Sequence, residues 1–488
     1  MKTLVATSEA YSLLHCGSIA FARCESSGIR IDTDYLDQTI ARTGQRITNL
    51  EAKLKQTKVW KIWVNAYGEK SNLNSRTQLG NVVFNLLKYP CHHYTAATGK
   101  PSTAEEDFED VDLPFVKGWL RYMDLCKLKA TFLEGLRRET IDGFCHPFLN
   151  LHTATTYRSS SGGDKEISKQ KDFNFQNLPI RKPLLASAIR PCVIPRKGHK
   201  IAEIDFSAHE FKLAASVWDD PRMIEYASDP KKDVHRDWGA KCYLLESDQV
   251  SKDTRQWAKT HFVFPHLYGS YYRNIARNLW DDMNKFGLRV KLPEDDPRKP
   301  TGPLVSDHLQ SLGIKALGAC DPRKDPAPGT FEFHIRNVEW EFDREFSVFA
   351  TGREKRWNDY LATGQFRLKT GFVIQGMCTK NYVMNSVVQG PAFHCLLWCI
   401  IRLQEEFDQR GLMSLILGQI HDCALVDIDN NEIQEVLSLA HRIMTQDIRE
   451  AFTWIKTPLD TEVDVVEEGE SWHQKRPWIV KDGVWGPK

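Results

Sequence analysis

The sequence lacks the usual signatures of a membrane, secreted or zinc-binding protein. No apolar run in its 488 residues approaches the ~18 residues of a membrane span. The first residues contain no apolar segment long enough for a secretory signal. The 12 cysteines include no Cys-x-x-Cys pair, and the nearest to clusters are Cys395-x-x-x-Cys399 and Cys91-His-His93. These absences favour free thiols in a reducing compartment, so we expect a cytoplasmic protein with no membrane partner, in the host cytoplasm if it is viral.

The sequence also lacks a strong net charge, an internal repeat and any low-complexity segment. Its formal net charge is +1, and its 41% hydrophobic and 26% charged residues are typical of a soluble globular protein. One local imbalance remains. Residues 158–200 contain ten Lys or Arg and three Asp or Glu, which suits either a solvated face or a track for phosphates.

Apolar periodicity predicts an extended helical arm in the first third of the chain. Helices are expected over 8–60 with a break at Gly28, including one over 34–57 capped by Asp32 or Thr33, then after 72–75 and over 111–138. Residues 207–290, 335–362 and 431–453 also read as helical, and 462–466 as a strand. Seven prolines between 291 and 330 predict a loop-like insertion.

Four stretches could carry chemistry, although each has a plain structural interpretation. Residues 200–206 alternate like a strand that ends in Asp205, after which Ser207 could cap a helix. Arg255 and Lys259 lie one helical turn apart, which suits a bound polyanion or a solvated surface helix. His421 and Asp422 separate two apolar stretches, as at a hairpin tip. Residues 156–161 and 174–181 are polar and amide-rich, suited to nucleic acid or to a plain loop.

Taken together and in order, these stretches closely resemble the family A DNA polymerases. Asp205-Phe-Ser-Ala-His-Glu-Phe-Lys212 resembles that family's motif A, Arg255 to Gly269 its motif B, and Gln419-Ile-His-Asp422 its motif C. Weaker resemblances extend this similarity over residues 20–472, at Gly28 to Asp32, Asn72 to Leu79, Asp233 to His235, Asn385 to Gly390, and Glu468 to Trp472.

The resemblance implies an α+β right-hand fold with an antiparallel palm sheet and helical thumb and fingers. Residues 1–33 would be a palm-associated segment and 34–140 the thumb. The palm would combine 141–218 with 368–488, and the fingers would span 219–367, including the insertion at 291–330.

The resemblance also implies a DNA-directed DNA polymerase that extends a primer 3′-hydroxyl with two Mg²⁺ ions held by Asp205 and Asp422. Lys259 would complete the catalytic set. Arg255, Lys259 and His235 would neutralise the triphosphate, with Phe264 and Tyr268 beside the nucleotide and Glu210 crowding the sugar 2′ position. The residues expected to contact primer–template DNA are Arg158, Asn177, Arg181, Asn385, Gln389 and His421.

Several positions depart from the family pattern. Phe206 replaces a tyrosine, Lys212 an arginine, Cys423 an acidic residue and Asn381 another arginine. Motif B is one residue longer than usual between Lys259 and Tyr268, so we match Phe264 to the family's phenylalanine and expect a π-bulge to absorb the surplus, with Pro265 following it.

Only about twenty residues precede the resemblance, so we expect a polymerase module without its own 3′–5′ exonuclease. A separate exonuclease or processivity protein is then an expected partner. Three alternatives stay open: a single-subunit RNA polymerase, disfavoured by Glu210; a His-Asp metal phosphohydrolase, disfavoured by the strand-like surroundings of Asp422; and a non-catalytic nucleic-acid-binding subunit.

Overall fold

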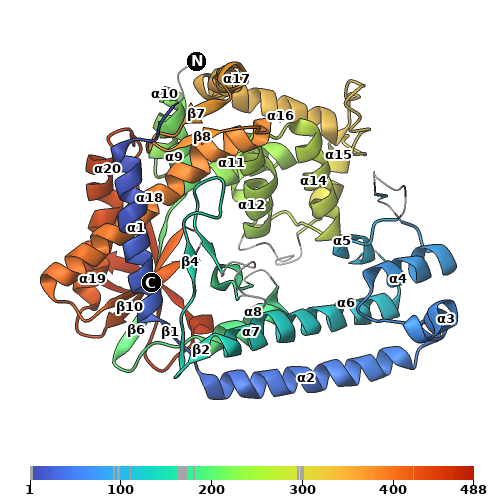
Figure 1. Cartoon of the computed structure of the whole chain (residues 1–488). Coiled ribbons are helices and arrows are strands. Elements are labelled where there is room, and N and C mark those ends of the chain that lie inside the picture. Colours follow the sequence, from blue (N-terminus) through green and yellow to red (C-terminus); the bar gives the residue numbers. More distant parts are fainter. Residues whose placement is uncertain are drawn as a thin grey trace.

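The computed structural model describes residues 4–91, 94–95, 99, 101–109, 111–162, 173–179, 182–293, 296, 302–420 and 422–488 (Figure 1). Arg181 and His421, both expected at the DNA-binding surface, lie outside the described residues. The structure shows an α+β chain with a central sheet, a helical arm and a helical lobe. This confirms the expected fold class.

The N-terminal helix packs on the body of the protein and ends at a glycine. Helix α1 (Ser8–Ser27) contacts α18 and β9, and Thr7 caps its first turn by accepting a hydrogen bond from the Ala10 N–H. Gly28 has φ +67°, a backbone conformation that glycine adopts easily, and the chain then enters β1 (Ile29–Arg30). The expected break at Gly28 is confirmed.

The helical arm follows, and it has a core of its own. Helix α2 (Thr33–Lys55) is capped by Asp32, as predicted, and runs beside α6 (Figure 1). Trp63, Leu79, Phe108, Val116 and Trp119 form the buried centre of the distal arm. The other elements of the arm are α3 (Lys58–Tyr67), α4 (Arg76–Gly80, capped by Ser75), the π-helical η2 (Asn81–Leu86), α5 (Glu105–Glu109), α6 (Pro114–Lys127), the π-helical η3 (Leu128–Leu133) and α7 (Glu134–Arg138).

A six-stranded antiparallel sheet forms the centre of the molecule. Its order is β13 (Val484–Pro487), β12 (Arg476–Lys481), β11 (Thr461–Val466), β6 (His199–Phe206), β10 (Cys423–Asp429) and β9 (Leu415–Ile420). Both faces are buried, because Ala202 and Ile204 enter one hydrophobic cluster while Ile201 enters another. The strand at 200–206 and the hairpin around 421–422 are confirmed; β12 and β13 were not predicted.

Helices cover the first face of this sheet. They are α9 (His209–Trp218), α18 (Lys380–Arg410), α19 (Ile433–Arg442), the π-helical η8 (Ile443–Asp447) and α20 (Ile448–Ala451). Helix α18 is long and apolar enough by composition to cross a membrane, but 78% of its apolar window is buried within the structure. That degree of burial is typical of a core helix.

The second face of the sheet and the surrounding loops carry short elements. These are β2 (Thr140–Ile141), β3 (Phe144–Cys145), β4 (Leu149–Asn150), β5 (Ser160–Ser161), η4 (Phe175–Asn177), α8 (Pro183–Ile189), η5 (Arg190–Cys192), β7 (Gln365–Arg367), β8 (Val373–Gln375) and η9 (Trp472–Gln474). The short strands and turns expected after residue 145 are thereby confirmed.

The helical lobe is built around a cluster of aromatic rings, which meet mostly edge-on or tilted. Trp238, Phe262, Phe342, Phe346 and Phe349 pack in its core. The expectation that 291–330 is loop-like is wrong in part, because Val305 and Leu309 are fully buried on a short helix, α15. The helices of the lobe are α10 (Pro221–Ser228), α11 (Val234–Tyr243), η6 (Ser247–Gln249), α12 (Lys252–Ala258), the π-helical η7 (Lys259–Val263), α13 (Phe264–Leu267), α14 (Tyr272–Lys285), α15 (Val305–Ser311), α16 (Phe331–Glu345) and α17 (Ser347–Thr363).

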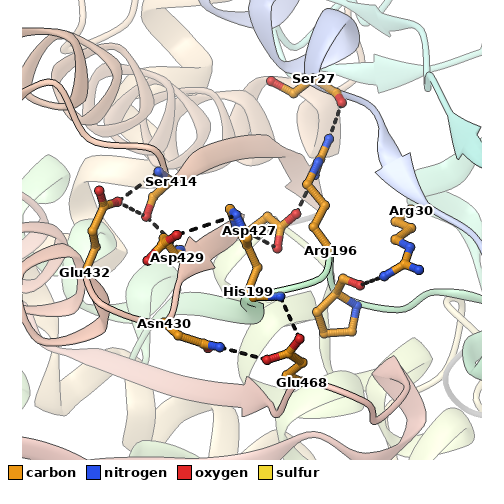
Figure 2. Close-up of polar contacts among 12 residues, drawn as sticks. Ser27, Arg30, Arg196, His199, Ser414, Asp427, Asp429, Asn430, Glu432 and Glu468 are labelled. Carbon is orange, nitrogen blue, oxygen red and sulfur yellow. Dashed lines mark hydrogen bonds and ion pairs between the residues drawn. The ribbon is translucent and has the colours of Figure 1, made fainter.

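A buried ionic cluster ties the far end of the sheet to the end of α1 (Figure 2). The Arg196 guanidinium donates to the Asp427 carboxylate on β10 and to the backbone oxygens of Ser27 and Gly28. The Asp427 side chain is only 1% exposed, and His199 Nδ1 lies 3.6 Å from its Oδ1. This contact fixes β6, β10 and the α1–β1 junction relative to one another.

We expect Arg196→Met to lower the thermal midpoint strongly, because it leaves the Asp427 carboxylate buried without its main partner. Breaking a buried pair in this way costs roughly 3–5 kcal/mol. The matched control is Arg23→Met, whose partner Asp408 is 52% exposed, and exposed pairs contribute about 1 kcal/mol or less. Differential scanning calorimetry of both variants is the measurement. Equal losses in the two would contradict a special role for the Arg196 contact.

Candidate active site

Two aspartates meet at one end of the central sheet. Asp205 is the penultimate residue of β6, and the sheet register places it opposite Cys423 on β10 and Glu462 on β11. Asp422 directly precedes β10, so the strand pairing brings it next to Asp205. Rigid strands therefore hold both carboxylates, while the acidic position of the family pattern is occupied here by the buried Cys423 thiol.

The carboxyls at this edge repel each other. Burial, with a smaller contribution from the Asp422 carboxylate, raises the pKa of Asp205 from its ordinary 3.8 to about 7. Glu210, on the first turn of α9, has its pKa raised to about 7 by burial and again by Asp422. Asp205 Oδ1 is buried and has no hydrogen-bond partner. The site thus gathers carboxyl groups whose charge the protein neutralises only in part, through Lys259 near Asp205 and through Arg158, which lies 4.0 Å from Asp422.

This charge pattern suits a divalent cation. Mg²⁺ prefers carboxylate oxygens and usually keeps several waters, so it needs only one or two protein carboxylates. The unpartnered Asp205 oxygen and the neighbouring Asp422 carboxylate provide that donor set. Within the part of the chain that the structure describes, which omits His421, no group of three or more His, Cys, Asp or Glu is arranged to hold a metal. The fit therefore rests on the two aspartates.

The raised pKa of Asp205 predicts a pH-dependent gain in stability for Asp205→Asn. A carboxyl group whose pKa is higher in the folded than in the unfolded protein lowers the stability of the fold as the pH rises. For Asp205 this loss builds up between pH 3.8 and about pH 7 and is complete above that range. We expect the thermal midpoint of the metal-free variant to exceed that of the wild type by more at pH 8 than at pH 5. The corresponding gain in the free energy of unfolding is at most roughly 4 kcal/mol. Calorimetry in a chelator measures this, and a difference independent of pH would contradict the burial of an ionised Asp205.

Arg255 and Lys259 lie on one continuous helix beside this pair. Lys259 begins the π-helical segment η7, where the Phe264 N–H donates to the Lys259 carbonyl five residues back. Pro265 follows on the first turn of α13, where its missing N–H is tolerated. The π turn expected from the extra residue is thereby confirmed, and it keeps Phe264 near Lys259, whose ammonium lies 5.3 Å from the Phe264 ring centroid.

Arg255 has an anionic partner within the protein. Its Nε donates to Asp233 Oδ2 at 2.6 Å, while Asp233 Oδ1 caps α11 by accepting from the N–H groups of His235 and Arg236. Asp233 lies 22 residues away along the chain and therefore escapes a local charge count. Lys259, in contrast, forms no ion pair with any residue that the structure describes.

His235 lies between these cations and is uncharged. Burial, with smaller contributions from Lys259 and Arg255, lowers its pKa to about 3. Its Nδ1 is buried without a hydrogen-bond partner, and its ring contacts Phe264 edge-on at 5.4 Å. The imidazole would therefore supply a hydrogen bond to a phosphate, whereas the positive charge comes from Arg255 and Lys259.

Tyr268 and Glu210 lie next to each other at this site. Their side chains interact, and burial raises the pKa of Tyr268 well above its usual range, with Glu210 adding to the shift. Tyr268 and Asn385 also line a cavity of about 330 Å³ with Pro265, Ser270, Asn381 and Tyr382. Asn385 Oδ1 is buried and unpartnered. The cavity thus adjoins the residue expected to exclude a ribose hydroxyl.

The residues expected to contact DNA are partly brought together. Arg158 Nη1 donates to Gln389 Oε1 at 2.9 Å, and its Nη2 lies 4.0 Å from Asp422 Oδ1. Asn177 is exposed on η4. Its neighbour Gln176 is buried instead, and it donates to the Gln419 backbone oxygen at 3.1 Å and to Ser159. The polar stretches near 158 and 176 therefore join the strand that leads to Asp422.

The expectation that Ser207 caps the following helix is wrong. Ser207 Oγ donates to Glu462 Oε1 at 2.9 Å, and α9 begins after Ala208, which has a left-handed backbone with φ +52° and makes no side-chain cap. Glu462 lies 255 residues away and takes the hydroxyl that a local reading assigns to the helix.

Sequence reasoning also missed His209. Its ring stacks on Phe206 at 4.0 Å, is fully buried, and has both nitrogens without partners. Burial lowers its pKa to about 4. The sequence could have indicated this residue, because His209 lies between Asp205 and Glu210 in the stretch that resembles motif A.

Comparison with known proteins agrees with this geometry. The model of "DNA polymerase family A" matches residues 33–285, just over half of the chain. The thermostable DNA polymerase I of Thermus aquaticus is 24% identical over 93% of this chain and 47% of its own length. DNA polymerase I of Caldicellulosiruptor bescii is 24% identical over 93% and 46%. The chain thus spans about half the length of the curated relatives it matches.

A solved structure shares the fold. The POL domain of Pol1 from M. smegmatis, in complex with DNA primer-template and dNTP, superposes with a TM-score of 0.69 at 21% identity, covering 94% of this chain and 70% of that one. With the family model spanning more than half of the residues, the identification is direct: this chain belongs to DNA polymerase family A.

Proposed function

We propose that this chain is a DNA-directed DNA polymerase that extends a primer 3′-hydroxyl on a DNA template with deoxynucleoside triphosphates. One observation carries the proposal: Asp205 and Asp422 form an under-neutralised carboxylate pair beside the cationic helix of Arg255 and Lys259. A carboxylate pair facing cations suits a reaction between a metal-bound hydroxyl and a polyphosphate.

In this proposal the carboxylates position the primer end. Asp205 and Asp422 would hold two Mg²⁺ ions, which when bound acidify the 3′-hydroxyl and stabilise the charge on the leaving pyrophosphate. Asp205 and Asp422 stay on rigid strand ends and therefore need no rearrangement. Lys259, free of any ion pair with the described residues, would donate to the triphosphate as negative charge develops there.

The remaining residues orient the nucleotide. Arg255, held by Asp233, and the neutral imidazole of His235 would bind phosphate oxygens. Phe264 would pack under the base, and Glu210 beside Tyr268 would fill the space that a 2′-hydroxyl needs. Specificity for the deoxy sugar would then arise from crowding.

The DNA would lie against the opposite wall of the site. Arg158, Gln389 and Asn385 could contact minor-groove acceptors, which every correct base pair presents in similar positions. The helical arm would be the thumb (34–140), the lobe the fingers (219–367), and the sheet with its helices the palm (141–218 and 368–488). The separate core of the arm supports this division.

Primer extension by the purified chain tests the proposal. We expect Mg²⁺-dependent addition of the template-directed deoxynucleotide to a recessed primer. Parallel reactions with ribonucleotides distinguish the RNA polymerase alternative, which predicts the reverse preference. Tight binding of primer–template without extension would favour the non-catalytic alternative and overturn the proposal.

We also propose that this chain does not edit. The support is that 94% of it aligns with a single polymerase domain, which leaves little for a nuclease. We expect no release of a labelled, mismatched 3′ nucleotide in the presence of Mg²⁺ and the absence of nucleotides. A family A enzyme with a known exonuclease is the positive control. Steady release that persists in Asp205→Asn would reveal a separate nuclease site.

A further inference from the structure

A second cavity continues from the nucleotide-binding residues away from the two aspartates. It encloses about 600 Å³ between the start of α9, the segment from the end of α10 to the start of α11 (226–236), Arg255 on α12, and the loop at 458–460. Of the residues assigned above to the nucleotide, only His235 and Arg255 line it. Asp205, Asp422, Glu210 and Lys259 do not, so the cavity begins where the proposed triphosphate site ends.

The positions of the charged groups indicate how this cavity connects to the two aspartates. Lys259 acts electrostatically on both Asp205 and His235, whereas Arg255 acts on His235 and Asp233. The path from the reaction centre therefore runs past Lys259 to His235 and Arg255, and then into the cavity. A phosphate group leaving the reaction centre along this path would enter it.

Three lysines on the cavity wall have no ion-pair partner. Lys212, Lys231 and Lys232 form no salt bridge with any residue in the described ranges, and the Lys232 ammonium lies 5.5 Å from the Tyr226 ring centroid. Burial lowers the pKa of Lys212, although Asp460 and Glu462 oppose this effect. The loop that carries Lys231 and Lys232 starts at Asp229, whose Oδ1 accepts the Lys231 N–H.

Three acids line the same cavity as these lysines. Besides Asp229, the cavity is lined by Asp233, which pairs with Arg255, and Asp460, whose Oδ1 accepts the Thr461 N–H. At its inner end, His235 Nδ1 is buried, 2% exposed as a residue, and without a partner. Unpaired cations and an unsatisfied imidazole nitrogen around one hollow indicate an anionic ligand.

We propose that this cavity binds inorganic pyrophosphate, the product of chain extension, through Lys231 and Lys232 with Lys212 and His235 beneath. The inference rests on the proposed polymerase function, because only that reaction releases pyrophosphate next to His235. Pyrophosphate is compact, highly charged and has no base, and the cavity offers the three lysines together with the neutral imidazole of His235. The site would hold the product after it leaves Lys259 and would precede its release to solvent.

The test compares the double variant Lys231→Gln/Lys232→Gln with wild type in two assays. In primer extension, we expect the inhibition constant of pyrophosphate to rise by roughly tenfold or more, since each charge-assisted contact contributes measurably to affinity. The KM for the deoxynucleotide should change less than about twofold, because the triphosphate site keeps Arg255, Lys259 and His235. In calorimetry, pyrophosphate with Mg²⁺ is titrated into the enzyme bound to primer–template.

Two further variants separate charge from fold. Lys231→Arg/Lys232→Arg keeps both charges and should retain pyrophosphate affinity. Lys252→Gln/Lys315→Gln removes two exposed lysines of the same lobe that lie outside the cavity and should behave as wild type. An unchanged inhibition constant in the glutamine variant would overturn the proposal. Equal rises in the inhibition constant and in the KM would overturn it too, by placing the lysines in the triphosphate site.

The calorimetric assay keeps this inference distinct from the polymerase function. If the chain fails to extend primers yet binds pyrophosphate in a manner that depends on Lys231 and Lys232, the anion site stands and the reaction assignment falls. If the chain extends primers but the calorimetric affinity is the same in every variant, the reaction assignment stands and the pyrophosphate site falls.

Discussion

Asp205→Asn and Asp422→Asn are each expected to reduce primer extension by roughly 10³-fold or more, because each removes a carboxylate that we propose holds a metal ion at the reacting atoms. Single-turnover extension of a labelled primer measures the loss. Primer–template affinity should stay within about twofold, since the DNA-contacting residues are intact.

The matched control is Asp464→Asn. Asp464 lies on β11 of the same sheet, opposite Glu203, and pairs with Lys475 at 2.8 Å. This substitution removes a carboxylate from the same sheet but leaves Asp205 and Asp422 in place, so primer extension should remain near the wild-type rate. Unfolding does not explain the loss in Asp205→Asn, because the raised pKa of Asp205 predicts a more stable metal-free variant above pH 7. Near-normal extension by either active-site variant would refute the metal-binding assignment.

Glu210→Ala is expected to admit ribonucleotides. Glu210 interacts with Tyr268 from the first turn of α9, so truncation would open the space from which we propose that a 2′-hydroxyl is excluded. We expect the ratio of kcat/KM values for deoxy- over ribonucleotide to fall by about 10²-fold, the scale at which a site discriminates by steric exclusion. Steady-state incorporation of both nucleotide types opposite the same template base measures this ratio.

Glu210→Gln separates crowding from charge. It keeps the size of the side chain and removes the ionisable group whose pKa is raised to about 7. If crowding excludes the hydroxyl, the glutamine variant retains most of the discrimination while the alanine variant loses it. Loss of discrimination in both would assign the selectivity to the carboxyl group itself, and loss of DNA synthesis without ribonucleotide use would assign Glu210 to another task.

The sequence was most informative where structure depends on neighbouring residues. The alternation at 200–206 predicted β6, and the caps at Asp32 and Ser75 predicted the starts of α2 and α4. The surplus residue in motif B predicted a π turn, because only a wider turn keeps both Lys259 and Phe264 on one face. In each case the deciding interactions lie within a few residues.

Prediction failed where a distant residue competes for the same group. Glu462 takes the Ser207 hydroxyl, and Asp233 neutralises Arg255, although neither lies near its partner in sequence. Helix α15 forms within a proline-rich segment because Val305 and Leu309 are buried in the lobe. The raised pKa of Asp205 arises from burial and from Asp422, and neither cause is visible in a string of residues.

The position of β6 in the sheet has a consequence for how the protein is made. Its two neighbours, β10 and β11, lie more than 200 residues later in the chain, at 423–429 and 461–466. Closing such long loops is slow, whereas the helical arm has mostly local contacts and can form early. A nascent chain on the ribosome would therefore complete its arm long before Asp205 meets Asp422. Catalytic competence should arise only after β10 and β11 have been synthesised, so a chain truncated before residue 461 would keep its arm and lack a complete active-site sheet.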